Sequence, residues 1–541
     1  MTTSATDSEP LLDVLIVGAG FGGMYMLYRL RAAGFRVGAF ERGGDVGGTW
    51  YWNRYPGARC DVESMSYSYA FDEALQQEWK WTERYAAQPE ILKYASHVAD
   101  RFNLRVNMEF NIDVVGTDWD DDANFWRVRL KGTDGEARTV TARHVVMATG
   151  CLSTANLPDI PGRDTFQGST YHTGRWPHQG VDFTGQRVAV IGTGSSAIQS
   201  IPIIAEQAAE LIVLQRTPNY AVPAHNAPLD PDKIAAIKAN YGTFRQIAQS
   251  RITCVVFDLP RPSALLDTPA ERAAEFERRW QTGGLGFMGA YADLLRNRTS
   301  NRHAADFVRS KIRQIVNDPE TAKKLSPENE IGCKRLCVDT GYYATYNRSN
   351  VRLIDLMDTP IRKIVTTGIE LEGAELIEVD AIVFATGFDA MTGTLTRIDI
   401  RGRGGLALRE VWEAGPRTYL GLSVAGFPNL FVITGPGSPS VLTNMISAIE
   451  QHVEWITDCL VTLRDQDRTV MEADLTAQND WVEHVNLTAE NNLRSHCSSW
   501  YIGANIEGKP RTFMPYIGGY PAYRAKCDDV AARGYEGFTT T

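Results

Sequence analysis

The sequence predicts an α/β protein with two Rossmann-like units, and two similar stretches of the chain carry this prediction. A short apolar run, Asp13 to Val17, precedes a glycine-rich stretch at 18–23 and then a helical pattern of apolar residues. The same order returns at Arg187 to Ile191 and 192–197, so that Gly192 lies 174 positions after Gly18. A strand, a glycine turn and a helix in this order place backbone amides against a pyrophosphate. We therefore expect two dinucleotide-binding domains.

The first glycine-rich stretch suits FAD. Its glycines, Gly18, Gly20 and Gly23, permit a tight turn and a close approach of the backbone to the ligand. A second predicted strand, Arg36 to Phe40, ends at Glu41, about twenty residues after the glycines. A carboxylate there accepts hydrogen bonds from a ribose diol and repels a ribose 2′-phosphate, which favours FAD or NAD over NADP.

The second glycine-rich stretch suits NADPH. Its residues are Gly192, Thr193, Gly194, Ser195 and Ser196. The strand after its helix, Leu211 to Gln215, is followed by Arg216, a cation where the first unit has an acid. A guanidinium can pair with a 2′-phosphate through two hydrogen bonds. A chain with both sites is expected to pass electrons from NADPH to FAD.

Changes of pattern along the chain predict the domain order. Helix formers with charged faces fill Pro231 to Ala248, Pro269 to Gln281 and Asn301 to Asp318, and we interpret their charges as solvated. The strand-like run Asp380 to Ala385 ends in a Thr-Gly turn that repeats the ending of Val145 to Gly150. The predicted parts are the FAD domain at 1–150 and 386–541, a linker with the first NADP segment at 151–220, a helical insertion at 221–329 and the second NADP segment at 330–385.

Composition excludes several classes of partner. The 541 residues are 43% hydrophobic and carry a formal net charge of -10, which disfavours nucleic acid and anionic membranes. No apolar run reaches the roughly 18 residues of a membrane helix, and Met1 to Pro10 is polar and acidic, so we predict a cytoplasmic protein with no obligatory protein partner. The eight cysteines show neither disulfide-scaffold nor zinc spacing, and we expect no thiol-redox or metal role for them.

Two long motifs identify a family. One is Phe166-x-Gly168-x-x-x-His172-x-x-x-Trp176-Pro177, and the other runs from Gly47 to Asp61 and includes Gly48, Thr49 and Trp50. With them the chain resembles the Baeyer-Villiger monooxygenases, flavoproteins that insert one oxygen atom of O2 beside a ketone carbonyl. The segment 435–445 is most similar to the phenylacetone and steroid monooxygenase branch of this family.

The resemblance implies a reaction and two catalytic residues. NADPH would reduce FAD, and the reduced flavin would form a C4a-peroxide that adds to the ketone and yields an ester or lactone through a tetrahedral adduct. Arg335 would be the fixed cation for the peroxide, and Asp61 would hold Arg335 beside the flavin. Hydrophobic aryl, cyclic or steroidal ketones are the expected substrates, with sulfoxidation as a side activity.

The resemblance also implies the remaining roles. Lys334, Arg216 and Thr217 would form the 2′-phosphate pocket, and Trp500 would belong to a mobile loop that closes over NADP. Phe166, Gly168, His172 and Trp176 would lie in a linker, where His172 either relays domain movement or transfers a proton. The substrate pocket would be shaped by Ser440, Val441, Leu442 and Met445.

Two other functions stay open from the sequence. One is a flavin-dependent oxygenase of sulfur or nitrogen, which needs no carbonyl adduct. The other is an NADPH-FAD reductase that passes electrons onward without oxygenating a product. A disulfide reductase is disfavoured because no Cys-x-x-x-x-Cys follows the first glycine loop.

Overall fold

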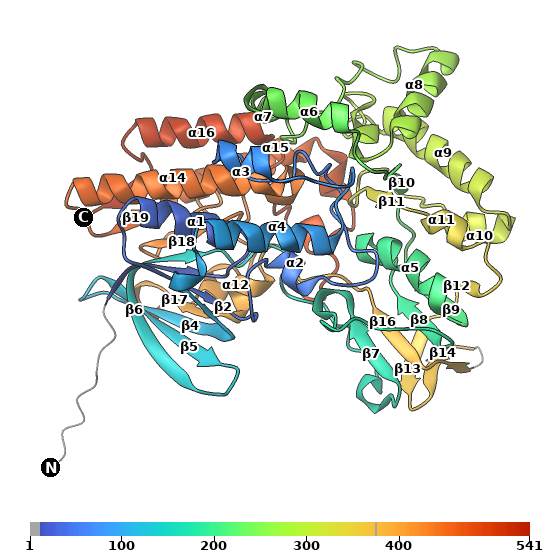
Figure 1. The fold of residues 1–541 in the computed structure, drawn as a ribbon, viewed down its shortest axis with the longest axis horizontal. Coiled ribbons are helices and arrows are strands. Elements are labelled where there is room, and N and C mark those ends of the chain that lie inside the picture. Colours follow the sequence, from blue (N-terminus) through green and yellow to red (C-terminus); the bar gives the residue numbers. More distant parts are fainter. Residues whose placement is uncertain (1–10, 374–375) are drawn as a thin grey trace.

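The computed structural model describes residues 11–373 and 376–541, and Met1 to Pro10, whose sequence suggested the absence of a signal peptide, lies outside them. Two sheets organise the two halves of the molecule (Figure 1). Helices α14 (Met445–Asp465) and α16 (Tyr520–Ala532) lie beside the N-terminal helix α1 (Phe21–Ala32) in the half that holds the first sheet. Residues far apart in sequence therefore build one domain.

The first sheet combines N-terminal and C-terminal strands. Its strand order is β17-β4-β5-β6-β1-β2-β3, and β18 pairs with the end of β6. The central strands β1, β2 and β6 run parallel, with Leu15 paired to Gly38 and to Val145. The bounds are β1 Leu12–Val17, β2 Val37–Glu41, β3 Met108–Phe110, β4 Ile112–Asp120, β5 Phe125–Gly132, β6 Ala137–Met147, β17 Asp399–Arg401 and β18 Leu430–Val432.

The second sheet is parallel throughout its described pairs and has the order β12-β9-β8-β16-β7. Helix α5 (Ser195–Gln207) follows β8 as the sequence predicted, and its apolar residues Ile198 and Ile201 are fully buried. The bounds are β7 Ser169–His172, β8 Arg187–Ile191, β9 Glu210–Gln215, β12 Val351–Asp355 and β16 Ala381–Phe384. The predicted α/β fold with two Rossmann-like units is confirmed. The domain boundaries stay a prediction.

Close backbone contacts explain the glycines that begin the two turns. A Cβ on Gly18 would lie 2.7 Å from the carbonyl oxygen of Ala148, and one on Gly192 would lie 2.5 Å from that of Ala385. Both glycines have positive φ, 105° and 112°, which disfavours any other residue. Each turn thus packs against the end of a neighbouring strand, β6 or β16, where the sequence repeats Ala-Thr-Gly.

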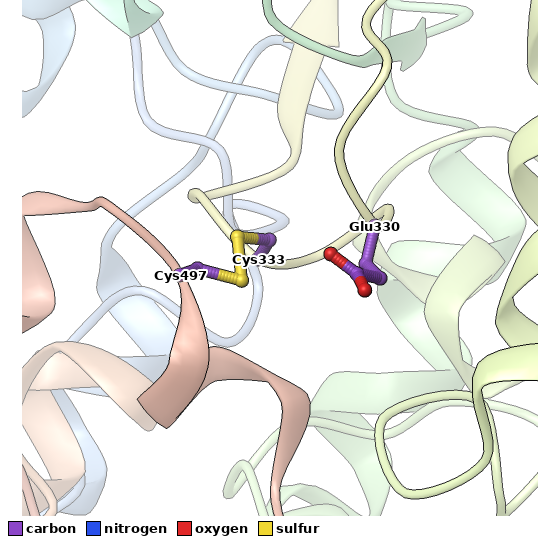
Figure 2. Close-up of side chains that lie close together, drawn as sticks. All are labelled: Glu330, Cys333 and Cys497. Atoms are coloured by element: carbon purple, nitrogen blue, oxygen red, sulfur yellow. A yellow bond between two sulfur atoms is a disulfide. The ribbon is translucent and has the colours of Figure 1, made fainter.

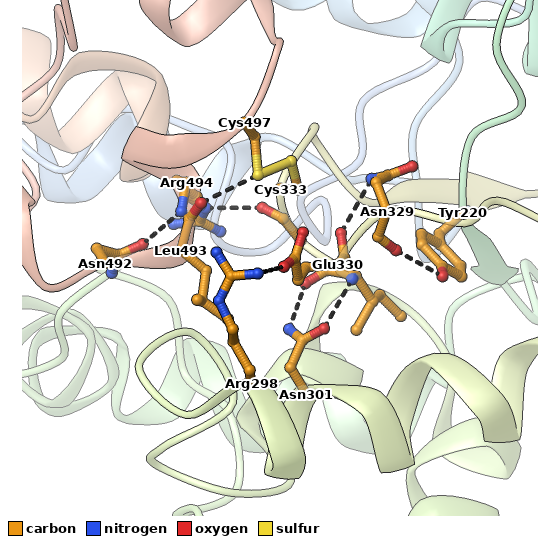
Figure 3. The surroundings of a disulfide bond; sticks show 12 residues. Tyr220, Arg298, Asn301, Asn329, Glu330, Cys333, Asn492, Leu493, Arg494 and Cys497 are labelled. Carbon is orange, nitrogen blue, oxygen red and sulfur yellow. Dashed lines mark hydrogen bonds and ion pairs between the residues drawn. A yellow bond between two sulfur atoms is a disulfide. The ribbon is translucent and has the colours of Figure 1, made fainter.

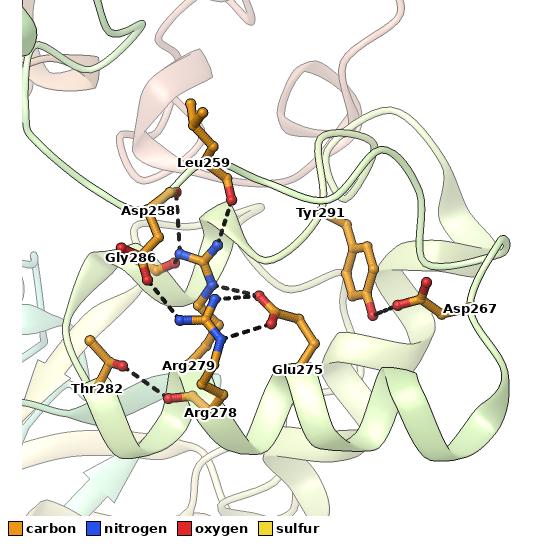
Figure 4. A network of polar contacts seen from close by, with 9 residues as sticks. All are labelled: Asp258, Leu259, Asp267, Glu275, Arg278, Arg279, Thr282, Gly286 and Tyr291. Atoms are coloured by element: carbon orange, nitrogen blue, oxygen red, sulfur yellow. Dashed lines mark hydrogen bonds and ion pairs between the residues drawn. The ribbon is translucent and has the colours of Figure 1, made fainter.

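In the helical insertion, α8, α9 and α10 pack on the second domain, whereas α6 and α7 pack against the first domain (Figure 1). Its helices are α6 Pro231–Ala239, α7 Tyr241–Gln249, α8 Pro269–Thr282, α9 Arg298–Ile315 and α10 Pro319–Lys324. The expectation that its charges are solvated is wrong for Glu275 and Arg279, whose side chains are 8% and 3% exposed and pair at 2.8 Å. Arg279 also donates to the carbonyl of Leu259 at 3.0 Å, so it fastens the preceding loop to α8 (Figure 4).

The segment predicted as a linker is partly a strand. Residues Ser169–His172 form β7, which pairs with β16 and so extends the second sheet at its edge. Trp176 is 3% exposed and packs on Tyr171, with ring centroids 5.4 Å apart. The motif is thereby built into the second domain, and only its flanks can act as connections.

Among the residues that the structure describes, no helix is both long and apolar enough to cross a membrane.

The remaining strands form small sheets at the edges of the two domains: β10 Ala221–Pro223 with β11 Cys337–Asp339, β13 Ile361–Val365 with β14 Gly368–Leu371 and β15 Leu376–Glu378, and β19 Met471–Ala473 with β20 Phe538–Thr540.

Candidate active site

Asp61 and Arg335, which lie 274 positions apart, meet between the two domains. Nε and Nη2 of Arg335 donate to the two carboxylate oxygens of Asp61 at 2.7 and 2.9 Å, a bidentate ion pair. Nη1 donates to the carbonyl of Val441 at 2.9 Å, in the predicted substrate segment. Burial opposes the charge of Arg335, but the Asp61 carboxylate outweighs it and raises the pKa, so the guanidinium stays protonated.

Two further side chains surround this cation. The phenol of Tyr501 lies beside the Arg335 guanidinium, and Tyr501 is 1% exposed. Arg494 lies with its guanidinium carbon 5.9 Å from the centroid of the Tyr501 ring. Burial and, to a smaller extent, the charge of Arg335 lower the pKa of Arg494. The region therefore concentrates positive charge that suits an anionic oxygen.

The first glycine turn fits the pyrophosphate and ribose of FAD. Helix α1 begins after Gly20, which provides no side-chain cap, so the first amides of the helix have no side-chain acceptor. Glu41 is 7% exposed and accepts from the amides of Ala19 and Gly43 at 2.8 and 2.7 Å, which fixes its carboxylate beside the turn.

The flavin-side motif lies against the same turn. A Cβ on Gly48 would come within 2.8 Å of the Cα of Gly20, so only glycine allows the two segments to touch. Thr49 and Trp50 begin the short helix α2 (Thr49–Trp52), and the indole of Trp50 donates to the Tyr67 hydroxyl at 3.1 Å. The flavin-side motif thus begins in contact with the first glycine turn and ends at Asp61.

The second glycine turn fits NADPH in the same way. Helix α5 follows Gly194 without a side-chain cap, and a Cβ on Gly194 would meet nothing within 4 Å. Thr193 donates to the carbonyl of Thr217 at 2.8 Å, and the hydroxyl of Ser196 lies 3.1 Å from that of Thr173. A pyrophosphate bound in the open space at the start of α5 would accept hydrogen bonds from the free backbone amides there.

Arg216 and Lys334 approach each other at the end of β9. Burial, and after it the charge of Arg216, lower the pKa of Lys334. Arg216 and Thr217 are exposed, and Lys334 is partly buried. Two cations that repel each other in the absence of an anion fit a 2′-phosphate, which would relieve this repulsion.

The predicted substrate residues line an apolar cluster next to Arg335. Ser440 and Val441 are buried, and Leu442 and Met445 are partly buried. The same cluster contains Trp500, whose ring lies 4.1 Å from that of Tyr501. The structure thus brings the segment 440–445 and the C-terminal loop together over the Asp61–Arg335 pair.

Several residues of this cluster were not predicted from the sequence. Besides Tyr501 they are Cys151, Leu152, Met391, Phe513 and Met514. Cys151 and Leu152 directly follow the Thr-Gly turn at the end of β6, and Met391 follows the matching turn after β16. Ligands commonly bind at the carboxyl ends of parallel strands, so the apolar residues after these two turns carried a usable signal.

His172 lies in the edge strand with both ring nitrogens occupied by backbone groups. Its Nδ1 accepts from the amide of Gly174 at 2.9 Å, and its Nε2 lies 3.3 Å from the carbonyl oxygen of Asn156. Burial lowers its pKa, which keeps the ring neutral. These contacts hold the turn after β7 in place and favour the structural alternative over proton transfer. Phe166 packs at the edge of the cluster around Ile382, and Gly168 avoids a clash with the Asp380 carbonyl.

The cysteine spacing gave no sign of a disulfide, but the described residues contain one. Cys333 and Cys497 are bonded to each other, with their Cα atoms 5.8 Å apart. The two residues are separated by 164 positions, so their spacing carried no signal. The other cysteines, which are free and buried, are Cys60, Cys151, Cys254, Cys337, Cys459 and Cys527.

Comparisons with known proteins agree with this site. Residues 12–238 match the family model "Pyridine nucleotide-disulphide oxidoreductase". A curated Baeyer-Villiger monooxygenase of Pseudooceanicola batsensis is 41% identical over 97% of this chain and 95% of its own length. The 2-oxo-Delta(3)-4,5,5-trimethylcyclopentenylacetyl-CoA monooxygenase of Pseudomonas putida is 39% identical over 98% of both chains.

A solved structure extends the likeness to three dimensions. An oxidised steroid monooxygenase bound to NADP superimposes with a TM-score of 0.92, is 50% identical, and is matched over 98% of this chain and 99% of its own. The fold, the two dinucleotide turns and the sequence identity over nearly the full length all point to the same family. The chain belongs to the Baeyer-Villiger monooxygenases, which oxidise ketones with FAD, NADPH and O2.

Proposed function

We propose that this monooxygenase oxidises a hydrophobic ketone beside the Asp61–Arg335 pair. The observation that carries the proposal is the position of this pair, with Nη1 of Arg335 bonded to Val441 at the edge of an apolar cluster. Arg335 supplies a fixed positive charge, and Asp61 holds the guanidinium in one orientation. A ketone in the cluster would lie next to that charge.

The residues of this chain hold and stabilise the reacting groups. When bound, FAD and NADPH supply the reducing equivalents and the activation of O2. Arg335 has one N–H on each terminal nitrogen that neither Asp61 nor Val441 engages. Tyr501 lies within hydrogen-bond reach of the guanidinium, and a remaining donor can bind an oxygen anion. Such a preorganised donor is typically worth about 10²–10³ in rate.

The substrate class follows from the lining of the site. Val441, Leu442, Met445, Met391 and Phe513 offer hydrophobic surface with few polar groups, which suits aryl, cyclic or steroidal ketones. The likeness to a steroid monooxygenase supports a bulky ketone. The thioether of a similarly shaped molecule would bind in the same place, which supports sulfoxidation as a side activity.

The cofactor roles extend to the second domain. We propose that Arg216, Thr217 and Lys334 bind the 2′-phosphate of NADP, because the two cations are brought together by the fold. Trp500, whose ring packs on that of Tyr501, would belong to the loop that closes over NADP. A cytoplasmic location and the absence of an obligatory protein partner remain parts of the proposal, and the net charge of -10 disfavours nucleic acid and anionic membranes as partners.

The test is product analysis with ¹⁸O2. Purified holoenzyme is incubated with NADPH and, separately, phenylacetone, a cyclic ketone, a steroid ketone and a thioether. The masses of the products are measured by mass spectrometry. One labelled oxygen in an ester or lactone supports the proposal. Label in the sulfoxide alone favours the sulfur oxygenase, and NADPH consumption without any labelled product favours the reductase.

Arg335→Ala tests the role of the cation. We expect ester formation to fall by about 10²-fold or more while NADPH still reduces the flavin, because the charge serves only the oxygen-transfer steps. Stopped-flow absorbance separates the two half-reactions. Arg348→Ala, at an exposed arginine outside the site, is the matched control. Ester formation by Arg335→Ala at the wild-type rate would contradict the assignment.

A further inference from the structure

A disulfide joins two parts of the active site that the reaction itself does not require to be joined. Cys333 and Cys497 are 2% and 6% exposed, and Figure 2 shows their sulfur atoms bonded between the segment near Glu330 and the C-terminal segment. Cys333 precedes Arg335 by two residues, and Cys497 precedes Trp500 by three. We call residues 497–514 the C-terminal loop. The bond fastens the base of this loop to the segment that carries Arg335.

Noncovalent contacts hold the two cysteines close whether or not the bond exists. Arg494 donates through Nε to the carbonyl of Gly332 at 2.9 Å, and the amide of Leu493 donates to the carbonyl of Leu295 at 2.9 Å (Figure 3). Because these contacts hold residues 493 and 494, just before Cys497, the thiols remain neighbours after reduction, whereas the loop that follows Cys497 loses its covalent attachment. The bond can then form again without a large rearrangement.

The far end of the loop is held by polar contacts and by the buried side chains of Phe513 and Met514. The ammonium of Lys509 pairs with Asp389 at 2.6 Å, and the side chain of Asn505 donates to the carbonyl of Phe388 at 2.7 Å. Between these contacts and Cys497 lie Trp500 and Tyr501, which cover Arg335. The covalent bond at the base of the loop therefore acts together with the ion pair and the apolar contacts in holding the loop over the site.

A metal ion is the competing occupant of this place. Glu330, Cys333 and Cys497 are grouped closely enough to offer three ligands among the described residues. However, the Glu330 carboxylate accepts from Arg298 at 2.7 Å, and Arg494 donates to the carbonyl of Gly332, the residue before Cys333 (Figure 3). Two guanidinium groups beside the ligands disfavour a divalent cation, and the bonded sulfurs offer no thiolate.

We propose that Cys333 and Cys497 form a reversible redox site that is oxidised by hydrogen peroxide and controls the closure of residues 497–514. The thiolate sulfur of one cysteine bonds to a peroxide oxygen as the O–O bond breaks, which gives a sulfenic acid and water after protonation. The sulfur of the second cysteine then displaces that hydroxyl as water. Two thiols are oxidised to one disulfide, and one peroxide is reduced to two waters. A dithiol reductant reverses the change.

The oxidised form is expected to keep the loop closed, and the reduced form to open it more often. In a protein of the proposed cytoplasmic location, disulfides are commonly transient and responsive to redox conditions, which agrees with a switch rather than a permanent staple. The inference rests on the proposed function only where it concerns turnover. The chemistry of the two thiols and the mobility of the loop can be measured without a ketone.

The first measurement counts thiols. Peroxide-treated holoenzyme is unfolded and alkylated without reductant, and intact mass is expected to show six modified cysteines, against eight after dithiothreitol, with Cys333 and Cys497 in one linked peptide. Eight reactive thiols in the peroxide-treated protein would overturn the proposal. One bound zinc per chain together with eight thiols would assign the place to a metal instead.

The second measurement follows the loop. We expect trypsin to cleave after Arg511 at least fivefold faster in dithiothreitol-treated than in peroxide-treated enzyme, and the double variant Cys333→Ser/Cys497→Ser to be cleaved fast in both. Cys527→Ser, at a buried cysteine in contact with Gln451 and Tyr523, is the matched control and should respond like wild type. Equal cleavage of oxidised and reduced wild type would refute control of the loop.

The third measurement connects the switch to turnover. With a saturating ketone, the reduced enzyme should release at least twofold more hydrogen peroxide per NADPH consumed than the oxidised enzyme, because an opened loop admits water. The double variant should show the higher ratio under both conditions. If the thiol count and the cleavage behave as expected but no ester forms from any ketone, the proposed substrate class fails and the redox site stands. An unchanged ratio with normal ester formation would refute the connection to turnover.

Discussion

At the scale of single residues, this protein depends on charges that the fold pairs or brings together. Arg335 has a bidentate partner in Asp61, whereas Arg216 and Lys334 are two cations placed side by side. The Asp61 carboxylate fixes the orientation of the Arg335 guanidinium. The Arg216–Lys334 pair creates a positive potential that an anion would neutralise. The two arrangements separate the roles of oxygen transfer and NADP recognition.

Arg216→Ala tests the second arrangement. We expect the KM for NADPH to rise about 10–100-fold, the value of a hydrogen bond to a charged group, while the KM for NADH changes little. Steady-state kinetics with both nucleotides measures this difference. Arg352→Ala, at an exposed arginine of β12, serves as the control. An equal rise for both nucleotides would show that the 2′-phosphate pocket lies elsewhere.

At the scale of elements, strand–turn–helix units place the ligands, and each glycine of a turn has its own reason. Gly192 is required by the neighbouring backbone, because its Cβ would lie 2.5 Å from the Ala385 carbonyl. Gly194 is free of such contacts, so its lack of a side chain serves the ligand rather than the fold. The two positions can be separated by experiment.

Gly192→Ala and Gly194→Ala form a matched pair. The first should lower the free energy of unfolding by about 1–3 kcal/mol, because it combines a steric clash with a backbone φ of 112°. The second should leave stability nearly unchanged and weaken NADPH binding. Urea unfolding and NADPH titration give the two readouts. Loss of stability in Gly194→Ala with unchanged binding would reverse the assignment.

The helical insertion provides a second test at this scale. Glu275→Ala leaves Arg279 buried without its carboxylate, which should cost about 3–5 kcal/mol. Glu277→Ala on the same helix removes a partly exposed pair with Lys311 and should cost about 0–1 kcal/mol. Chemical denaturation of the two variants measures the contrast. Similar values for both would mean that Glu275 is solvated, as the sequence pattern suggested.

At the scale of the whole molecule, buried titratable groups link stability to pH. His452 is fully buried and accepts the Thr434 amide at 2.9 Å, and burial lowers its pKa to about 3. Burial likewise lowers the pKa of His144 to about 4. An unfolded histidine titrates near about 6.5, so the unfolded chain binds protons that the folded protein does not. Their contribution is complete above pH 6.5 and is lost as the pH falls.

Glu450 acts in the opposite direction. Burial raises its pKa to about 7, so between about pH 4.5 and 7 the folded carboxyl keeps a proton that the unfolded chain releases. Its contribution is present below that window and is lost as the pH rises. The two histidines together outweigh this single carboxyl between pH 4.5 and 6.5, and wild type should lose stability on acidification.

His452→Gln tests this balance. The variant should reduce the pH dependence of the unfolding free energy between pH 5 and 6 by about 1.4 kcal/mol per pH unit, the value for one proton. Urea unfolding at the two pH values measures the slope. Glu450→Gln should change the slope in the other direction. Parallel slopes for wild type and His452→Gln would show that His452 does not titrate differently in the two states.

The sequence by itself determined the fold class, the two dinucleotide turns and the family, because these depend on local order. A strand, its glycines and the residue after the next strand lie within about thirty positions, and Glu41 and Arg216 were found there. The predicted strands agree with the observed ones to within one or two residues in β1, β2, β8, β9 and β16. Asp61 and Arg335 came from the resemblance to the family, and the structure brings them together.

Only the tertiary structure decided which distant residues touch. Tyr501 and Cys151 join the substrate cluster, and the segment expected as a linker adds strand β7 to a sheet. Burial is decided at the same level, because neighbouring elements cover Glu275 and Arg279, which lie four positions apart on α8. The disulfide between Cys333 and Cys497 spans 164 positions. Periodicity reports which face of an element is apolar, but not which element will cover it. Contacts of this kind arise from packing between elements that are distant in the chain, for which a single sequence carries no local pattern.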